Sequence, residues 1–220
     1  MTKVFYLDVN FLQDTALFEA AIKLLPSHRK EKLDKTKNME DKFLSIGAWL
    51  ALEEALKCFP LYNGDKEIIK SKKGKPYFKN EKEIYFSLSH SGNIALCAVS
   101  DKEVGADIQL MGEFNDKICK KYFSHSEAQY VFSASTKEEK EKRFFRIWSL
   151  KEAYVKMTGE GIFDFKKFSL LEDNKAFIRF PENVSFISLP TNNPSGFASL
   201  NHLPLHKGGF GINRLLIVLF

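Results

Sequence analysis

The longest helical pattern in the chain reads Arg143-Phe144-Phe145-Arg146-Ile147-Trp148-Ser149-Leu150-Lys151-Glu152-Ala153-Tyr154-Val155-Lys156-Met157. Apolar side chains occupy most of its circumference, which is typical of a buried helix. Gly159 and Gly161 follow closely, and glycine favours the left-handed backbone with which many helices end. We therefore expect a long buried helix over residues 143–157.

Strands and helices precede this helix in the chain, and only short strand-like runs follow it. Runs of β-branched, aromatic and other apolar residues predict strands at 4–9, 84–88, 94–99, 103–109, 176–180, 184–189, 196–200 and 215–220. Helical spacing of apolar residues predicts helices at 17–25, 27–37, 41–58 and within 115–134. A lysine-rich connector covers 65–76, and residues 89–93 have the composition of a hairpin turn.

Each half of the chain contributes one long helix, 41–58 or 143–157, and several strands. This pattern is compatible with two related subdomains. No Ser/Gly-rich hinge marks a boundary, so the least arbitrary division lies near residues 101–103. It gives an N-terminal part, 1–103, and a C-terminal part, 104–220.

The composition is that of a folded protein with a mildly basic surface. A hydrophobic fraction of 44% and 21 phenylalanines argue for a packed core, because disordered chains are poor in aromatic residues. The net charge of +5, from 33 basic and 28 acidic residues, suits an anionic ligand or an acidic partner protein. Binding to nucleic acid is the weaker alternative, because basic residues are not concentrated as such proteins require.

The cysteines and the apolar runs bear on the cellular location. Cys58, Cys97 and Cys119 form no C-x-x-C spacing, which argues against a disulfide framework or a structural zinc site and fits a reducing compartment. The first residues lack the pattern of a signal peptide. The longest apolar run, 215–220, is far below the ~20 residues of a membrane span. We therefore expect a cytoplasmic protein without membrane contact.

Asp107 and Gln109 stand two residues apart in the strand predicted at 103–109. Alternate residues of a strand share a face, so both side chains would lie on the side opposite Ala106 and Ile108. A carboxylate and an amide oxygen can share one hard cation. The alternative is a strand end with two exposed polar residues.

Glu152 and Lys156 are neighbours on the helix predicted at 143–157, because residues four apart lie on one side. They form either an ordinary surface ion pair or a buried pair whose charges need a metal or a phosphate as partner. The surrounding aromatic residues leave both possibilities open.

Two further segments carry groups that bind anions. Ser89 and His90 lie where the strands 84–88 and 94–99 reverse, and such a turn holds phosphate oxygens through hydroxyl, imidazole and backbone donors. Lys75 lies in a basic turn before Pro76 and could clamp a phosphate. Each segment is also compatible with an ordinary solvated turn.

Four motifs occur in a fixed order along the chain: Gly74-Lys75-Pro76, Phe86 to Ser91, Gly105-Ala106-Asp107 and Trp148 to Gly161. This order resembles the surfactin-synthetase-activating (Sfp-like) type of 4′-phosphopantetheinyl transferase. The family pattern of tryptophan, two residues, Lys-Glu-Ala or Lys-Glu-Ser and a further lysine is matched by Trp148, Lys151, Glu152, Ala153 and Lys156. The resemblance covers about residues 73–161, with a weaker echo at 24–33.

The resemblance implies a fold of two similar α+β subdomains related by a pseudo-twofold. Each would be a small antiparallel sheet packed on a long helix, with the ligand cleft between them. It also implies a monomer that transfers the 4′-phosphopantetheine group of coenzyme A to a serine of an apo acyl, polyketide or peptidyl carrier protein. The reaction would depend on Mg²⁺ and release adenosine 3′,5′-bisphosphate.

The resemblance also assigns roles to individual residues. Asp107, Glu152 and Gln109 correspond to the Mg²⁺ ligands. Coenzyme A would be bound by five side chains, and Lys156 among them would hold the pyrophosphate: Lys75, Ser89, His90, Lys151 and Lys156. The proton of the carrier serine would pass to Glu152 or Glu127, and the sequence does not choose between them.

This chain departs from the family pattern at two positions. Many members have a second acid where this chain has Gln109, so we expect weaker metal binding. The family often has an arginine where this chain has Phe43, and Lys42 is a possible substitute. The departure at Gln109 keeps one rival function open. In that case the chain would be a non-catalytic member of this fold that binds coenzyme A or a carrier protein.

Overall fold

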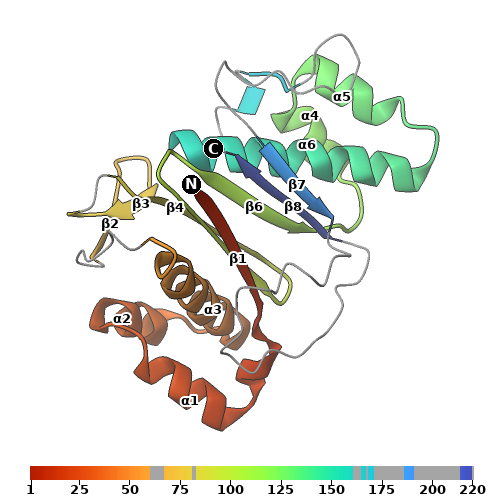
Figure 1. Ribbon diagram of the computed structural model, residues 1–220. Helices are drawn as coiled ribbons and strands as arrows, with labels where there is room; N and C mark the ends of the chain where they lie inside the picture. Colours follow the sequence, from red (N-terminus) through yellow and green to blue (C-terminus); the bar gives the residue numbers. More distant parts are fainter. Residues whose placement is uncertain are drawn as a thin grey trace.

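The computed structural model describes residues 1–59, 67–80, 83–160, 165–166 and 168–170, together with the backbone of two strands at 186–190 and 214–219. The strands predicted at 176–180 and 196–200 lie outside these residues. Antiparallel sheets and helices are segregated along the chain, which confirms the predicted α+β class (Figure 1). No helix within the described ranges has the length and hydropathy to cross a membrane.

The first sheet has the strand order β1-β5-β4 and is antiparallel throughout. Its strands are β1 (Thr2–Asp8), β4 (Tyr85–Ser91) and β5 (Ile94–Ser100). The long helix α3 (Met39–Leu56) lies on one face, and its first turn is capped by the Asn38 side chain. Trp49 and Leu52 of α3 are buried in the same core cluster as Phe5 and Leu7 of β1.

Shorter elements extend this first unit. The 3₁₀ helix η1 (Val9–Gln13) leads into α1 (Thr15–Lys23) and α2 (Ser27–Lys35), which lie beside α3 (Figure 1). Asp14 caps α1 by accepting hydrogen bonds from two backbone N–H groups. A short hairpin joins β2 (Ile68–Lys70) to β3 (Pro76–Phe78). β2 lies in the segment predicted as a connector at 65–76, and β3 begins at the last residue of that segment.

The second sheet has the order β6-β8-β7 and is also antiparallel. Its strands are β6 (Gly105–Leu110), β7 (Phe186–Pro190) and β8 (Arg214–Leu219). The helix α6 (Lys137–Thr158) lies along β6, and α4 (Asp116–Tyr122) and α5 (His125–Phe132) pack beside it (Figure 1). Gly159 ends α6 in the left-handed conformation at φ 75°, as the sequence predicts.

Three serine side chains join the two sheets. Among the described residues no main-chain ladder links β4 to β6. Instead, the serines at every second position of β4 accept hydrogen bonds from the backbone N–H groups of every second residue of β6. Ala106 N donates to Ser87 Oγ over 2.9 Å, Ile108 N to Ser89 Oγ over 3.3 Å and Leu110 N to Ser91 Oγ over 2.9 Å. We call this row of three hydroxyls the serine seam.

The contact between β6 and α6 depends on Gly105. A Cβ atom at this position would lie 1.9 Å from the carbonyl oxygen of Ala153 and 2.6 Å from the backbone nitrogen of Met157. Any larger side chain would therefore separate strand from helix. Gly105 and Asp107 share one face of β6, so this close approach brings Asp107 to the turn of α6 that carries Glu152 and Lys156.

The structure corrects the turn predicted at residues 89–93. β4 continues to Ser91, and the reversal is made by Gly92 and Asn93 alone, with Gly92 at φ 58°. A two-residue hairpin turn requires such positive φ values. Ser89 and His90 therefore lie on a strand and face opposite sides of it, instead of clustering in a loop.

Candidate active site

A pocket of about 310 Å³ lies between the β3–β4 region and the end of α6. Residues from both predicted parts of the chain line it, namely Lys73, Gly74, Lys75, Pro76, Phe86, Ser87, Leu88, Glu152, Val155, Lys156, Gly159 and Glu160. Three of the predicted site residues, Lys75, Glu152 and Lys156, belong to this lining. Such a concave surface with few convergent charged groups is typical of a small-molecule site.

Asp107 is buried beside this pocket. Its side chain is 5% exposed, and Oδ1 accepts hydrogen bonds from Lys156 Nζ over 2.7 Å and from Ser89 Oγ over 2.8 Å. Lys156 Nζ also donates to Ser89 Oγ over 2.9 Å. Asp107, Ser89 and Lys156 thus form a closed triangle with residues from β6, β4 and α6.

The second carboxylate oxygen of Asp107 has no such partner. Oδ2 is buried and makes no hydrogen bond within the described part of the chain. A buried carboxylate oxygen without a partner is costly, and a cation would relieve that cost. This orphan oxygen fits a metal ion next to Asp107.

Glu152 is the second carboxylate at this point. Burial raises the pKa of Glu152 above its ordinary value; the charge of Lys156 opposes this effect and that of Asp107 adds to it. Two neighbouring carboxylates are a suitable pair for Mg²⁺, which is bound through one or two carboxylates together with substrate phosphates and water.

Gln109 follows Asp107 on the same face of β6 and is partly buried. Its amide oxygen could complete the donor set of Asp107 and Glu152. Within the described residues, no group of three or more His, Cys, Asp and Glu side chains gathers at one point. The candidate site consequently has two carboxylates, Asp107 and Glu152. A glutamate or aspartate at position 109 would supply a third.

Lys75 connects the β2–β3 hairpin to the C-terminal end of α6. Its ammonium group donates to the carbonyl oxygen of Met157 and lies 4.0 Å from Glu103, and its aliphatic stem passes beside Gly159. Burial lowers the pKa of Lys75, and Glu103 partly offsets this effect. Lys75 is therefore held in the pocket wall, close to Glu152 and Lys156.

His90 is exposed on the opposite face of β4 from Ser89. Partial burial of the ring lowers the pKa of His90; Lys156 and Lys32 lower it further, while Asp41 and Asp107 oppose the shift. These groups come from α6, α2, α3 and β6, so His90 is near the point where four elements meet.

Two cations of α2, Arg29 and Lys32, were not singled out from the sequence. Burial lowers the pKa of Lys32, and the positive charges of Arg29 and Lys70 lower it further. Arg29 is anchored to α3, because it donates to Ser45 O over 2.9 Å and lies 5.4 Å from the centre of the Trp49 ring. The sequence signal for this pair was their spacing, because residues three apart lie on the same side of a helix.

Position 43 contributes to the core. The Phe43 ring packs edge-to-face on Phe18, with 5.5 Å between ring centres. Position 43 therefore supplies no cation in this chain. Lys32 provides positive charge near His90 instead, and Lys70 lies near Lys32.

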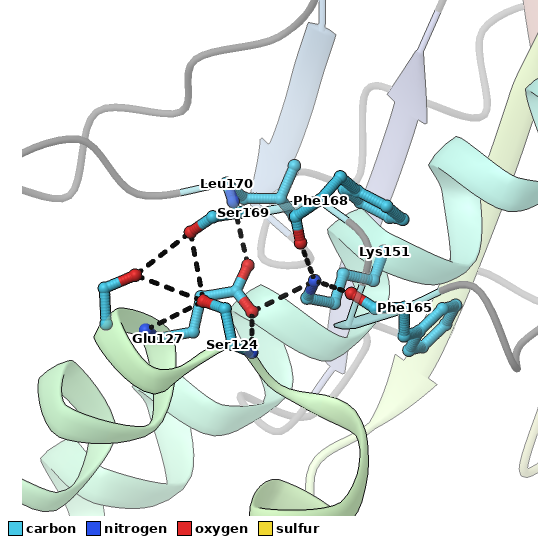
Figure 2. Close-up of polar contacts among 8 residues, drawn as sticks. Ser124, Glu127, Lys151, Phe165, Phe168, Ser169 and Leu170 are labelled. Carbon is cyan, nitrogen blue, oxygen red and sulfur yellow. Dashed lines mark hydrogen bonds and ion pairs between the residues drawn. The ribbon is translucent and has the colours of Figure 1, made fainter.

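Glu127 and Lys151 form a second polar cluster (Figure 2), and neither residue belongs to the pocket lining. Both side chains are 0% exposed, and Lys151 Nζ lies 3.0 Å from Glu127 Oε2. Lys151 also donates to the carbonyl oxygens of Phe165 over 2.6 Å and Phe168 over 2.9 Å. All three N–H groups of this ammonium therefore have acceptors.

Both carboxylate oxygens of Glu127 also accept hydrogen bonds from the backbone. Oε1 accepts from Leu170 N over 2.8 Å, and Oε2 accepts from Ser124 N over 2.8 Å in a capping box at the start of α5. The cluster ties Phe165 and residues 168–170 to α5 and α6 (Figure 2). This geometry favours a structural role for Glu127 and Lys151 over the catalytic and coenzyme A-binding roles that the sequence analysis assigned to them.

Comparisons with known proteins agree with the motifs. The model of the 4′-phosphopantetheinyl transferase superfamily matches residues 103–195. The chain is 38% identical over 113 residues to 4′-phosphopantetheinyl transferase psf-1 of Bacillus pumilus, an alignment that covers 50% of this chain and 48% of that protein. It is 29% identical over 160 residues to a 4′-phosphopantetheinyl transferase of Bacillus subtilis, covering 71% of each chain.

A third relative is matched over a longer segment. The chain is 26% identical over 171 residues to 4′-phosphopantetheinyl transferase Sfp of Bacillus subtilis strain 168, covering 76% of each chain. The first of the three alignments thus spans about half of its relative, and the other two span about three quarters. The pocket residues Glu152, Val155 and Lys156 of α6 lie within the segment that the family model matches, and so does Asp107 of β6 beside the pocket.

Proposed function

Because the chain belongs to the 4′-phosphopantetheinyl transferase superfamily, we propose that it transfers the 4′-phosphopantetheine group of coenzyme A to a serine of an apo acyl or peptidyl carrier protein. The serine oxygen forms a bond to the β-phosphorus, the bond from this phosphorus to the bridging oxygen breaks, and adenosine 3′,5′-bisphosphate leaves. The reaction requires Mg²⁺.

One observation carries this proposal: the buried, unpartnered oxygen of Asp107 beside Glu152 and Lys156 at the wall of a pocket. Asp107 and Glu152, with Gln109 as a weaker donor, would hold the Mg²⁺. When bound, this ion would neutralise the charge of the pyrophosphate. Lys156 and Lys75, which line the same pocket, would bind phosphate oxygens of the substrate.

Glu152 is the better candidate for the group that takes the serine proton. It lines the pocket, and burial raises its pKa, which makes its carboxylate a stronger base than an ordinary glutamate. Glu127 has no exposed surface and uses both oxygens in hydrogen bonds. A carrier serine could reach Glu152 through the pocket.

The nucleotide end of coenzyme A would lie towards His90 and the cations of α2. Lys32 interacts electrostatically with Arg29, with Lys70 and with His90. Clustered positive charges with few opposing acids attract phosphate groups. The 3′-phosphate of coenzyme A is the anion that this cluster would bind.

We expect the affinity for adenosine 3′,5′-bisphosphate to rise as the pH falls from about 8 to about 6.5. The lowered pKa of His90 leaves the free imidazole neutral, and a bound phosphate would favour the imidazolium. One proton is then taken up on binding, which limits the change to about tenfold per pH unit. Isothermal titration calorimetry at several pH values measures it.

The variant His90→Gln provides the control for this pH dependence. It keeps a polar side chain that cannot become charged in this range. Its affinity should lose the increase at low pH, while its stability should change little because the position is exposed. An equal pH dependence in both proteins would show that His90 does not bind the phosphate.

The proposed reaction is tested by the intact mass of purified apo carrier proteins after incubation with this protein, coenzyme A and Mg²⁺. We expect the carrier to gain the mass of one phosphopantetheine. Omission of Mg²⁺ and the variant Glu152→Ala should each reduce the rate by at least about a hundredfold, as is typical when a general base or a metal is removed.

The control variant is Glu138→Ala, which changes an exposed glutamate of the same helix and should transfer the group at the wild-type rate. If folded wild-type protein modifies no acyl, polyketide or peptidyl carrier but binds coenzyme A, the function is binding without catalysis.

A further inference from the structure

Ser89 has a hydroxyl group whose hydrogen-bonding capacity is completely used. A serine hydroxyl donates one hydrogen bond and accepts two. Ser89 Oγ accepts from Ile108 N over 3.3 Å and from Lys156 Nζ over 2.9 Å. Its remaining contact is with Asp107 Oδ1 at 2.8 Å.

The direction of that last hydrogen bond follows from the first two. A backbone N–H and an ammonium group can only donate, so both lone pairs of Ser89 Oγ are occupied. The hydroxyl proton must therefore point to Asp107. Ser89 is 6% exposed, so water does not compete freely for this proton, and a hydrogen bond to a carboxylate is stronger than one between neutral groups.

Two donors consequently hold the same oxygen of Asp107. Ser89 and Lys156 both donate to Oδ1, while Oδ2 is buried without a hydrogen-bond partner among the described residues. A carboxylate held at one oxygen cannot rotate about its Cβ–Cγ bond without breaking both bonds. Oδ2 is thereby kept fixed and available.

We propose that Ser89 is a positioning residue that orients the Asp107 carboxylate so that Oδ2 is presented to the metal ion. This inference rests on the proposed function and deepens it. It replaces the role in nucleotide binding that the sequence suggested for Ser89, because the hydroxyl has no further hydrogen-bonding capacity for a phosphate. Ser89 acts through Asp107 and does not itself touch the metal.

Ser91 offers a matched comparison within the same seam. Its hydroxyl accepts from Leu110 N over 2.9 Å, as that of Ser89 does from Ile108 N. It is partly exposed, is absent from the pocket lining and lies at the far end of β4. Loss of the Ser91 hydroxyl therefore reports the effect of a seam hydrogen bond without the contact to Asp107.

The experiment measures Mg²⁺ binding directly, by calorimetric titration of Mg²⁺ into the full chain with saturating coenzyme A and no carrier protein. In Ser89→Ala we expect the dissociation constant for Mg²⁺ to rise by about tenfold or more, the usual effect of removing a group that orients a metal ligand. Ser91→Ala should change it by less than about twofold, because that hydroxyl does not reach Asp107.

A second variant separates orientation from folding. Ser89→Cys fills the space of the hydroxyl with a somewhat larger thiol that donates only a weak hydrogen bond. Its dissociation constant for Mg²⁺ should also rise by about tenfold, which tests the inference if the alanine variant does not fold. Equal Mg²⁺ affinities in the folded Ser89 and Ser91 variants would overturn the inference alone. A wild-type protein that binds coenzyme A but no Mg²⁺ would overturn the metal site and the inference together.

Discussion

Gly105→Ala is expected to destabilise the protein by roughly 3 kcal/mol, at the upper end of what overpacking usually costs. The added methyl group would meet the carbonyl oxygen of Ala153 at 1.9 Å and the backbone nitrogen of Met157 at 2.6 Å. Both are main-chain atoms inside α6, so no rotamer change relieves the contact and strand and helix must separate. A native domain has only about 5–15 kcal/mol of stability in total.

The same substitution should affect the candidate site in molecules that remain folded. Asp107 lies two residues from Gly105 on the same face of β6, and it meets Lys156 at 2.7 Å. A shift of β6 away from α6 lengthens this contact. We therefore expect weaker Mg²⁺ binding in the folded fraction, as well as a lower midpoint in urea unfolding followed by circular dichroism.

Two other glycines provide a graded control for Gly105. A methyl group on Gly47 would lie 2.4 Å from a side-chain carbon of Val9, which can move, so Gly47→Ala should destabilise the protein less. Gly112→Ala should have little effect, since no atom of the described residues lies within 4 Å of the added carbon. A Gly105→Ala variant as stable as Gly112→Ala would contradict the close packing of β6 on α6.

Glu127→Gln is expected to destabilise the protein by about 3–5 kcal/mol, the usual result of removing one partner of a buried ion pair. The ammonium group of Lys151 would remain at 0% exposure without its counter-charge. Lys151→Met should cost a similar amount, because it leaves Glu127 charged and the carbonyl oxygens of Phe165 and Phe168 without their donor.

The double variant Glu127→Gln/Lys151→Met should be more stable than the sum of the single effects predicts, because it buries no unpaired charge. The exposed pair Glu138–Lys142 on α6 is the control, and its disruption should cost less than about 1 kcal/mol. Urea unfolding measures all these changes. A Glu127→Gln protein with wild-type stability but no transferase activity would restore Glu127 as the candidate base.

Much of the fold could be predicted from local sequence patterns. Helical spacing at 41–58 corresponds to α3 at Met39–Leu56, and the pattern at 143–157 lies inside α6 at Lys137–Thr158. α6 begins earlier than predicted. The prediction missed its first turns because they are charged and lack apolar periodicity. Thr136, whose side chain caps the helix at Glu139 N, was the signal that marks this start.

The candidate site was only partly predictable. The resemblance grouped Asp107, Glu152 and Lys156, and the structure brings Asp107 and Lys156 into contact. Local patterns alone could not establish this contact, since the two residues are 49 positions apart and meet only because Gly105 lets β6 lie against α6. Whether these residues hold Mg²⁺ and coenzyme A stays a prediction.

Charged residues in the core were the least predictable feature. Lys151 and Glu152 are adjacent in the chain and in the family motif, yet Lys151 is buried beside Glu127 and Glu152 lines the pocket. Lys151 follows the buried Ile147 by four positions, so helical spacing places both on one face. That spacing and the capping-box pattern at Ser124 and Glu127 were the sequence signals for the burial of Lys151 and for the structural role of Glu127.

The serine seam makes the junction of the two sheets depend on side-chain identity. Every non-proline residue supplies the amide and carbonyl groups of an ordinary ladder, so most substitutions leave such a ladder intact. Between β4 and β6 the acceptors are the hydroxyls of Ser87, Ser89 and Ser91, and each can be lost by a single codon change. Among related sequences, we therefore expect the three serines of the pattern Ser-x-Ser-x-Ser, which precedes a two-residue turn, to be conserved together. We expect the strand that corresponds to β6 to be conserved with them.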